Sequence, residues 1–144
     1  MDGATRLRDL LDQAAAHADR VDEAVAASEV LLGQFGSEGG VSTDELVALL
    51  EAQSEAAIGA AMRAGRIAAE AVEELDAVAD GELAPLVARF GREQGDSGPW
   101  SADDVRAAVH QEAAATSQRA RHGVDTQRAL VERGRSHAMR GMRS

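Results

Sequence analysis

Apolar positions in the first part of the chain recur every three or four residues, as they do along one side of an α-helix. Asp and Glu occupy many of the positions between them and would form an acidic, solvated outer face. We therefore predict a long amphipathic helix over about residues 4–33, whose apolar stripe packs on other helices. The stripe consists of Leu7, Leu11, Ala14, Ala18, Val21, Val25, Ser28 and Leu32.

A second helix is predicted over about residues 43–80, after a glycine-rich loop at about residues 33–42. Its start is marked by Ser42 and Glu45, which have the spacing of a capping box. Alanine and glycine dominate the middle of its apolar stripe, around Gly65. Small side chains let another helix approach closely but bury little apolar area, so we expect a thin core there.

A short third helix is expected over about residues 83–91, because Pro85 suits a first helical turn and apolar residues follow at helical spacing. A loop at about residues 91–101 then leads into the last helix. We predict this helix over about residues 102–138, where apolar residues again recur every three or four positions.

Local signals mark both ends of the last helix. Ser101 and Asp104 fit the N-cap and third helical positions, while Trp100 and Val105 fit the positions of a hydrophobic staple. We expect residues 134–144 to be frayed. The reason is that the last helix contains three glycines, each of which costs about 1 kcal/mol relative to Ala in a helix interior. They are Gly123, Gly134 and Gly141.

These elements predict an all-α fold, an elongated antiparallel helical bundle with coiled-coil-like heptads, built from three long helices and one short helix. The length of 144 residues fits one domain over residues 1–144. The Ala-rich core must offset a conformational entropy of about 1–2 kcal/mol per residue. We therefore expect modest stability as a monomer, or stabilisation by self-association or by a partner. A high melting temperature that does not depend on protein concentration would contradict this expectation.

The composition excludes several kinds of site. The chain contains no Cys, and so no disulfide, thiolate zinc site or iron–sulfur cluster. All 15 basic residues are Arg, and without Lys neither a Walker-A phosphate loop nor a Schiff base can form. No apolar stretch is long enough for a secretory signal or a membrane span. We therefore expect a cytoplasmic protein without membrane contact.

Charge is distributed unevenly along a chain whose formal net charge is −10. Residues 1–104 contain 22 acidic residues and 7 Arg, whereas residues 105–144 contain 3 acidic residues and 8 Arg. In one interpretation the basic last helix packs beside the acidic helices of the same chain. In the other, the basic segment meets an acidic surface of a partner. Nucleic-acid binding is disfavoured, because the chain as a whole is acidic and its basic segment has no aromatic residue.

Histidines and carboxylates form no motif that indicates a particular chemistry. No two of His17, His110, His122 and His137 stand three or four residues apart, and no Glu-x-x-His occurs, so one helix cannot present a metal-binding pair. A site assembled between helices, such as His17 with His110 or His122, stays open. The dense carboxylates of residues 70–82 fall mostly opposite apolar residues, which favours a solvated face. We expect no metal, no cofactor and no enzymatic activity.

The sequence favours a non-enzymatic protein–protein interaction module, a small acidic helical adaptor, chaperone or assembly factor that contacts itself or a protein partner. The stripe of the first helix has two interpretations, as a partner surface or as the internal core of the bundle. An alternative function is a small-molecule-binding bundle acting as a sensor or regulator, with a pocket near Phe90 and Trp100. The contact residues that we expect are Leu7, Leu11, Val21, Val25, Leu32, Ile58, Met62, Gly65, Arg128 and Arg135.

In size, acidity and helix length the chain resembles flagellar and type III export chaperones. Its acidic helices followed by a basic C-terminal segment are similar to those of phage scaffolding proteins. Both resemblances concern shape and composition along the chain and include no specific motif. They imply a class of function and assign no particular site residue.

Overall fold

Helices make up nearly all of the chain that the structure describes. The computed structural model describes residues 3–34, 42–94 and 100–142, and these residues contain no strand. The all-α fold class is confirmed. The elements are α1 (Gly3–Gln34), α2 (Thr43–Ala77), the 3₁₀ turns η1 (Asp80–Glu82) and η2 (Ala84–Leu86), α3 (Val87–Gln94) and α4 (Ala102–Met142).

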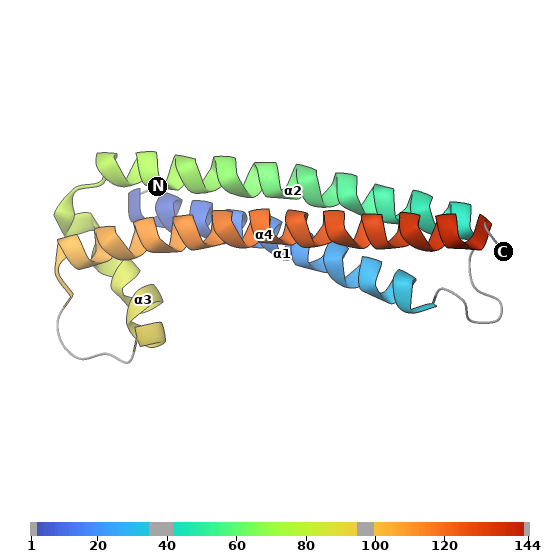
Figure 1. Ribbon diagram of the computed structural model, residues 1–144. Coiled ribbons are helices and arrows are strands. Elements are labelled where there is room, and N and C mark those ends of the chain that lie inside the picture. Colours follow the sequence, from blue (N-terminus) through green and yellow to red (C-terminus); the bar gives the residue numbers. More distant parts are fainter. Residues whose placement is uncertain (1–2, 35–41, 95–99, 143–144) are drawn as a thin grey trace.

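The three long helices lie side by side and form an elongated bundle (Figure 1). α1 and α4 run in the same direction, and α2 runs opposite to both. The turns η1 and η2 and the short helix α3 lie at the end of the bundle where α1 begins and α2 ends. α2 packs more extensively on α1 and on α4 than these two helices pack on each other. α2 therefore takes part in both of the larger interfaces between the long helices.

Several helix boundaries differ from the predicted ones, among them the end of α3, which lies at Gln94 rather than near residue 91. α2 ends at Ala77 rather than near residue 80, because Val78 adopts an extended conformation with φ of −92° and ψ of 128°. The side chain of Val78 is buried there and packs on Gly3, where a Cβ atom would lie 2.7 Å from Val78 Cγ2. The short helix begins as the turns η1 and η2 and becomes α-helical at Val87.

Both predicted N-caps are present. The backbone N–H of Glu45 donates to Ser42 Oγ at 3.2 Å. The N–H of Asp104 donates to Ser101 Oγ at 3.1 Å, and the N–H of Ser101 donates to Asp104 Oδ2 at 2.9 Å, so a reciprocal capping box begins α4. These bonds satisfy N–H groups that have no partner within the helix. They explain why α2 and α4 begin where the sequence predicts.

A side chain of α4 closes the other end of α2. The guanidinium of Arg106 donates to the backbone carbonyls of Leu75 at 2.8 Å and of Val78 at 2.7 Å. It also donates to Asp80 Oδ1 at 2.8 Å. Because α2 has no basic residue in its own last turn, Arg106 supplies the positive charge that stabilises a helix C-terminus. It also binds two carbonyl groups at the end of the helix, of which that of Leu75 accepts a second hydrogen bond, from the backbone N–H of Val78 at 3.2 Å.

Replacing Arg106 by Ala is expected to lower the free energy of unfolding by about 2 kcal/mol, because two backbone carbonyls lose a charged donor. Urea denaturation followed by circular dichroism measures this change. Arg121→Ala is the matched control, since Arg121 is an exposed arginine of the same helix. Losses of equal size in the two variants would contradict the capping role of Arg106.

The core changes in composition along the bundle. At the α3 end, large side chains dominate, among them Leu7, Leu11, Leu75, Leu86, Phe90 and Val109. In the middle the buried residues are alanines and valines, and the larger Ile58 packs against them only from a half-buried position. The buried residues are Ala18, Val21, Ala24, Ala57, Ala60, Ala64, Ala120 and Val124. The far end has a small cluster of Leu46, Leu50 and Val131. The thin core predicted for the middle of α2 is therefore confirmed.

Two glycines of α4 have a packing role that the sequence analysis did not assign. A Cβ atom at Gly123 would overlap Cγ1 of Val21 in α1, and one at Gly134 would overlap Cδ1 of Leu50 in α2. These glycines therefore let α4 approach both other helices closely. The helix continues through residue 134 to Met142, beyond the end predicted near residue 138.

Arginines of the basic segment pair with acidic residues of the other helices. Nη1 of Arg119 lies 2.9 Å from Asp19 Oδ1 and 2.8 Å from Asp22 Oδ2, both in α1. Nη2 of Arg135 lies 2.9 Å from Glu51 Oε1 in α2. For these two arginines, the contacts support the intramolecular interpretation of the uneven charge.

Candidate interaction surface on α2 and α4

An open groove runs between α2 and α4 toward the end of the bundle opposite α3. Its volume is about 580 Å³. We call it the α2–α4 groove, and it is lined by Glu51, Ser54, Glu55, Arg128, Val131, Glu132 and Arg135. Both arginines that the sequence predicts as contact residues line this groove. The structure therefore brings Arg128 and Arg135 together with carboxylates of both helices.

The two arginines of the groove are held differently. Arg135 donates to Glu51 Oε1 at 2.9 Å and to Glu132 Oε1 at 2.7 Å. These hydrogen bonds, the one to Glu51 above all, raise the pKa of Arg135. In the described part of the chain Arg128 has one ion pair, a loose one of 3.8 Å to Asp125, and its side chain is 66% exposed. Arg128 is thus the cation of the groove that is best placed to pair with an acidic group of a partner.

Three further predicted contact residues lie on α2 beside the groove. Ile58 stands four residues after Ser54, Met62 four residues after Ile58, and Gly65 three residues after Met62, so they continue the same side of the helix. Ile58 is half-buried, and Met62 is 71% exposed. A Cβ atom at Gly65 would meet no described atom within 4 Å. We call Ile58, Met62 and Gly65 the α2 shelf.

The predicted contact residues of the first helix lie elsewhere. Leu7, Leu11 and Val21 are buried in the core of the bundle, whereas Val25 and Leu32 are half-buried. Of the two interpretations of the first-helix stripe, the structure supports the core for the three buried residues. A partner would reach them only if the helices of the bundle separated.

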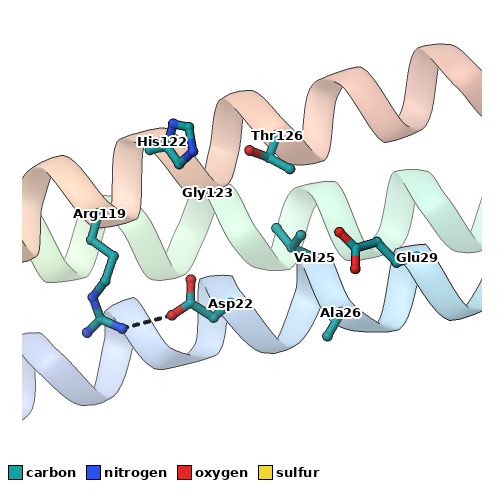
Figure 2. Close-up of a pocket in the computed structure, with 8 residues that line it drawn as sticks. All are labelled: Asp22, Val25, Ala26, Glu29, Arg119, His122, Gly123 and Thr126. Atoms are coloured by element: carbon teal, nitrogen blue, oxygen red, sulfur yellow. Dashed lines mark hydrogen bonds and ion pairs between the residues drawn. The ribbon is translucent and has the colours of Figure 1, made fainter.

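A second, smaller groove lies between α1 and α4 (Figure 2), with a volume of about 300 Å³. We call it the α1–α4 groove, and it is lined by Asp22, Val25, Ala26, Glu29, Arg119, His122, Gly123 and Thr126. Arg119 bridges the two helices at one end of it through its ion pair with Asp22. Hydrogen bonds to the carboxylates of α1, the one to Asp19 above all, raise the pKa of Arg119. This groove contains one of the predicted contact residues, Val25.

The histidines are not gathered into a metal site. In the described ranges no three His, Asp or Glu side chains are placed to hold a metal ion. Nη1 of Arg20 lies 3.4 Å from Nδ1 of His17. Burial lowers the pKa of the His17 ring, and the charges of nearby arginines lower it further. These positive charges disfavour a metal cation at His17, which the sequence analysis left open as a ligand together with His110 or His122.

The wild type is expected to lose more stability on acidification than the variant His17→Gln. The fold lowers the pKa of His17, whereas the unfolded chain keeps the ordinary value of 6.5. Below about pH 6.5 the unfolded chain therefore binds a proton at His17 more readily than the folded chain does. The free energy of unfolding falls as the pH drops below that value, until the pH has passed the lowered pKa of His17 in the folded chain. Urea midpoints of the wild type and of His17→Gln, measured from about pH 8 to about pH 5, give the slope of stability against pH for each protein. Equal slopes would contradict the expectation.

The rings of Phe90 and Trp100 stack on each other, with centroids 6.2 Å apart and planes inclined by 25°. Phe90 belongs to the core cluster at the α3 end, and Trp100 packs against the same cluster, which also contains Val105. The two rings therefore contribute core contacts where the alternative function would need a ligand pocket. The two grooves described above are lined by other residues.

A buried polar contact that the sequence analysis missed links the three long helices. Nε2 of Gln127 donates to Ser28 Oγ at 2.8 Å and to the backbone carbonyl of Leu50 at 3.2 Å. Gln127 and Ser28 are fully buried, and Gln127 Oε1 has no hydrogen-bond partner among the described residues. The sequence feature that could have indicated this contact is the position of Gln127 on the apolar stripe of α4, three residues after Val124 and four before Val131.

Of the two grooves described above among the placed residues, the α2–α4 groove contains two of the predicted contact residues and adjoins three more. None of the helices in the described ranges is both long and apolar enough to cross a membrane. Comparison of the chain with protein-family models, with curated proteins and with solved structures found no match.

Proposed function

We propose that this chain is a non-enzymatic protein–protein interaction module, a small acidic helical adaptor, chaperone or assembly factor. The observation that carries the proposal is the α2–α4 groove with the α2 shelf and its exposed Met62 beside it. An amphipathic helix of a partner binds to this kind of surface by laying its apolar side into the groove. A cytoplasmic location, expected from the sequence, is part of the proposal.

The side chains of this surface indicate what the partner helix must present. Met62 offers flexible, polarisable apolar surface that adapts to the side chains packed on it. Arg128 offers a positive charge without a tight partner of its own. A partner helix with an acidic residue beside its apolar stripe would pair with Arg128 while it covers Met62. Charged contacts at the edge of an interface set orientation and association rate more than affinity.

The variant Arg128→Glu tests this proposal. Wild type and variant are each used to capture proteins from a lysate of the source cells, and the captured proteins are quantified by mass spectrometry. We expect at least one protein that the wild type captures to fall by about ten-fold with Arg128→Glu, because the reversed charge repels an acidic partner. Arg8→Glu is the matched control, since Arg8 is an exposed arginine of α1. If Arg128→Glu and Arg8→Glu captured the same amounts of every protein, the α2–α4 groove would not be the contact surface.

A second candidate is a small-molecule-binding bundle that acts as a sensor or regulator, and the α1–α4 groove favours it. Its volume of about 300 Å³ lies at the lower end of the range of ligand pockets, roughly 300–1,000 Å³. Its lining combines apolar with charged side chains. A ligand would raise the melting temperature of the wild type, and Ala26→Trp, which fills the groove, should abolish that shift. A shift that survives Ala26→Trp would exclude this groove as the site.

A further inference from the structure

An exposed side of α2, which borders the α2–α4 groove at Glu55, carries a line of residues that is complementary to itself. Glu55, Gly59, Met62 and Arg66 follow one another at helical spacing and share one face of the helix. We call them the outer line of α2. Figure 1 shows α2 along one edge of the bundle, with α1 and α4 on its inner side. The inner side of α2 consists of buried residues, among them Ala57, Ala60, Ala64 and Ala68.

The described part of the chain leaves the outer line uncovered. Among the large apolar side chains whose exposure the structure describes, Met62 is the most exposed, at 71%. A Cβ atom at Gly59 would meet no described atom within 4 Å, so no contact within the bundle requires glycine there. Neither Glu55 nor Arg66 takes part in a hydrogen bond or an ion pair with a described residue. The outer line thus presents an exposed methionine between two opposite charges, neither of which forms an ion pair within the described residues.

We propose that a second copy of this chain covers the outer line, with the two α2 helices packed antiparallel. The two-fold axis then passes the middle of the line, between Gly59 and Met62. Each Met62 lies level with Gly59 of the second copy, and each Glu55 lies level with Arg66 of the second copy. A single patch pairs with itself in this way in symmetric dimers. The inference rests on the proposed function, since it takes α2 as a protein-contact surface, and it names the partner of the outer line. Because both contacts use Met62, the second copy and a partner helix in the α2–α4 groove would compete for this side chain.

Charge and shape both favour the antiparallel arrangement. It brings a Glu55–Arg66 pair to each end of the contact, whereas a parallel arrangement in register would place Glu55 against Glu55 and Arg66 against Arg66. Because Gly59 has no side chain, the helices approach closely at the centre, and Met62 has room beside it. The exposed small residues Ala52 and Ala69 also lie level with each other in this register and extend the contact at both ends.

The size of the contact predicts a weak dimer. From Glu55 to Arg66 the outer line spans roughly 16 Å at 1.5 Å per residue, which is short for a stable interface. We therefore expect a monomer–dimer equilibrium with a dissociation constant on the order of 10–100 μM. Ion pairs at the ends of the contact weaken as salt concentration rises, so the dissociation constant should rise between low and high salt.

Charge reversal tests the pairing in the purified chain. In Glu55→Arg and in Arg66→Glu, like charges meet at both ends of the homodimer, and we expect sedimentation equilibrium to show self-association weakened by about ten-fold or more. An equimolar mixture of the two variants should form a heterodimer, because every arginine then meets a glutamate. The double variant Glu55→Arg/Arg66→Glu should dimerise like the wild type for the same reason. Circular dichroism of each variant shows whether the helices remain folded.

A second pair of variants tests the centre of the contact. Gly59→Leu places a side chain where Met62 of the second copy would lie and should weaken the dimer by a similar factor. Gly33→Leu is the matched control, because Gly33 is an exposed glycine of α1, away from the outer line, where a Cβ atom also meets no described atom within 4 Å. A wild type that stays monomeric up to about 1 mM, single variants that dimerise normally, or a mixture that fails to form the heterodimer would each overturn the proposal. These measurements use only the purified chain, so their failure leaves the capture result with Arg128→Glu unaffected, and the reverse also holds.

Discussion

Replacing Leu11 by Asp is expected to unfold the chain. Leu11 is 2% exposed and belongs to the core cluster that joins α1 to α2, α3 and α4. An aspartate there would place an unpaired carboxylate among leucines, which costs about 4 kcal/mol or more. A small domain has a total stability of about 5–15 kcal/mol, and the alanine-rich middle of this bundle adds little to it. Loss of the far-ultraviolet circular dichroism of the purified variant measures the result.

The same substitution at Leu49 is the control for Leu11→Asp. Leu49 also lies in a long helix, α2, but it is 41% exposed, so an aspartate there keeps contact with water. We expect Leu49→Asp to remain helical and to shift the urea midpoint only slightly. If Leu11→Asp also stayed helical and instead lost the capture of a partner, the stripe of α1 would be a partner surface. That outcome would contradict its place in the core.

Local signals were sufficient to place the long helices. The spacing from Leu7 to Leu32 repeats every three or four residues and predicted α1 nearly to its ends. Ser42 and Ser101 predicted the starts of α2 and α4, because an N-cap depends only on residues within one helical turn. The end of α2 was harder to predict, since it depends on Arg106, a residue of another helix.

The candidate site could be predicted only in part, for the same reason. The small residues around Gly65 and the basic character of Arg128 and Arg135 are visible in the sequence. That these residues lie along one side of the bundle follows from the antiparallel packing of α2 and α4, which no local pattern contains. The stripe that includes Leu11 shows the opposite difficulty. Its periodicity is the same whether it faces a partner or the core of its own bundle.

The variant Gly123→Ala is expected to lower the free energy of unfolding by about 2 kcal/mol, because overfilled contacts typically cost about 1–3 kcal/mol. Helix propensity alone predicts the opposite, a gain of about 1 kcal/mol for the same change. We expect the contact with α1 to outweigh helix propensity, so that Gly123→Ala lowers the free energy of unfolding. The added Cβ would overlap Cγ1 of Val21, a branched side chain that is buried and cannot turn away. Urea denaturation measures the change.

Gly65→Ala is the matched control for Gly123→Ala, and we expect it to stabilise the chain by up to about 1 kcal/mol. Gly65 also lies within a long helix, but a Cβ atom there would meet no described atom within 4 Å. The two changes remove the same backbone freedom and add the same methyl group, so they differ only in what the methyl group meets. Changes of the same sign in the two variants would contradict the close approach of α4 to α1 at Gly123.

A double variant separates the overlap with Val21 from other effects of Gly123→Ala. Val21→Ala alone removes two buried methyl groups and should cost about 2 kcal/mol through the cavity it leaves. In Val21→Ala/Gly123→Ala the new methyl group enters that space instead of overlapping Cγ1. The double variant should therefore be more stable than the sum of the single changes predicts, by about 1–2 kcal/mol. Additive losses would mean that Gly123→Ala acts through the helix itself and not through its contact with α1.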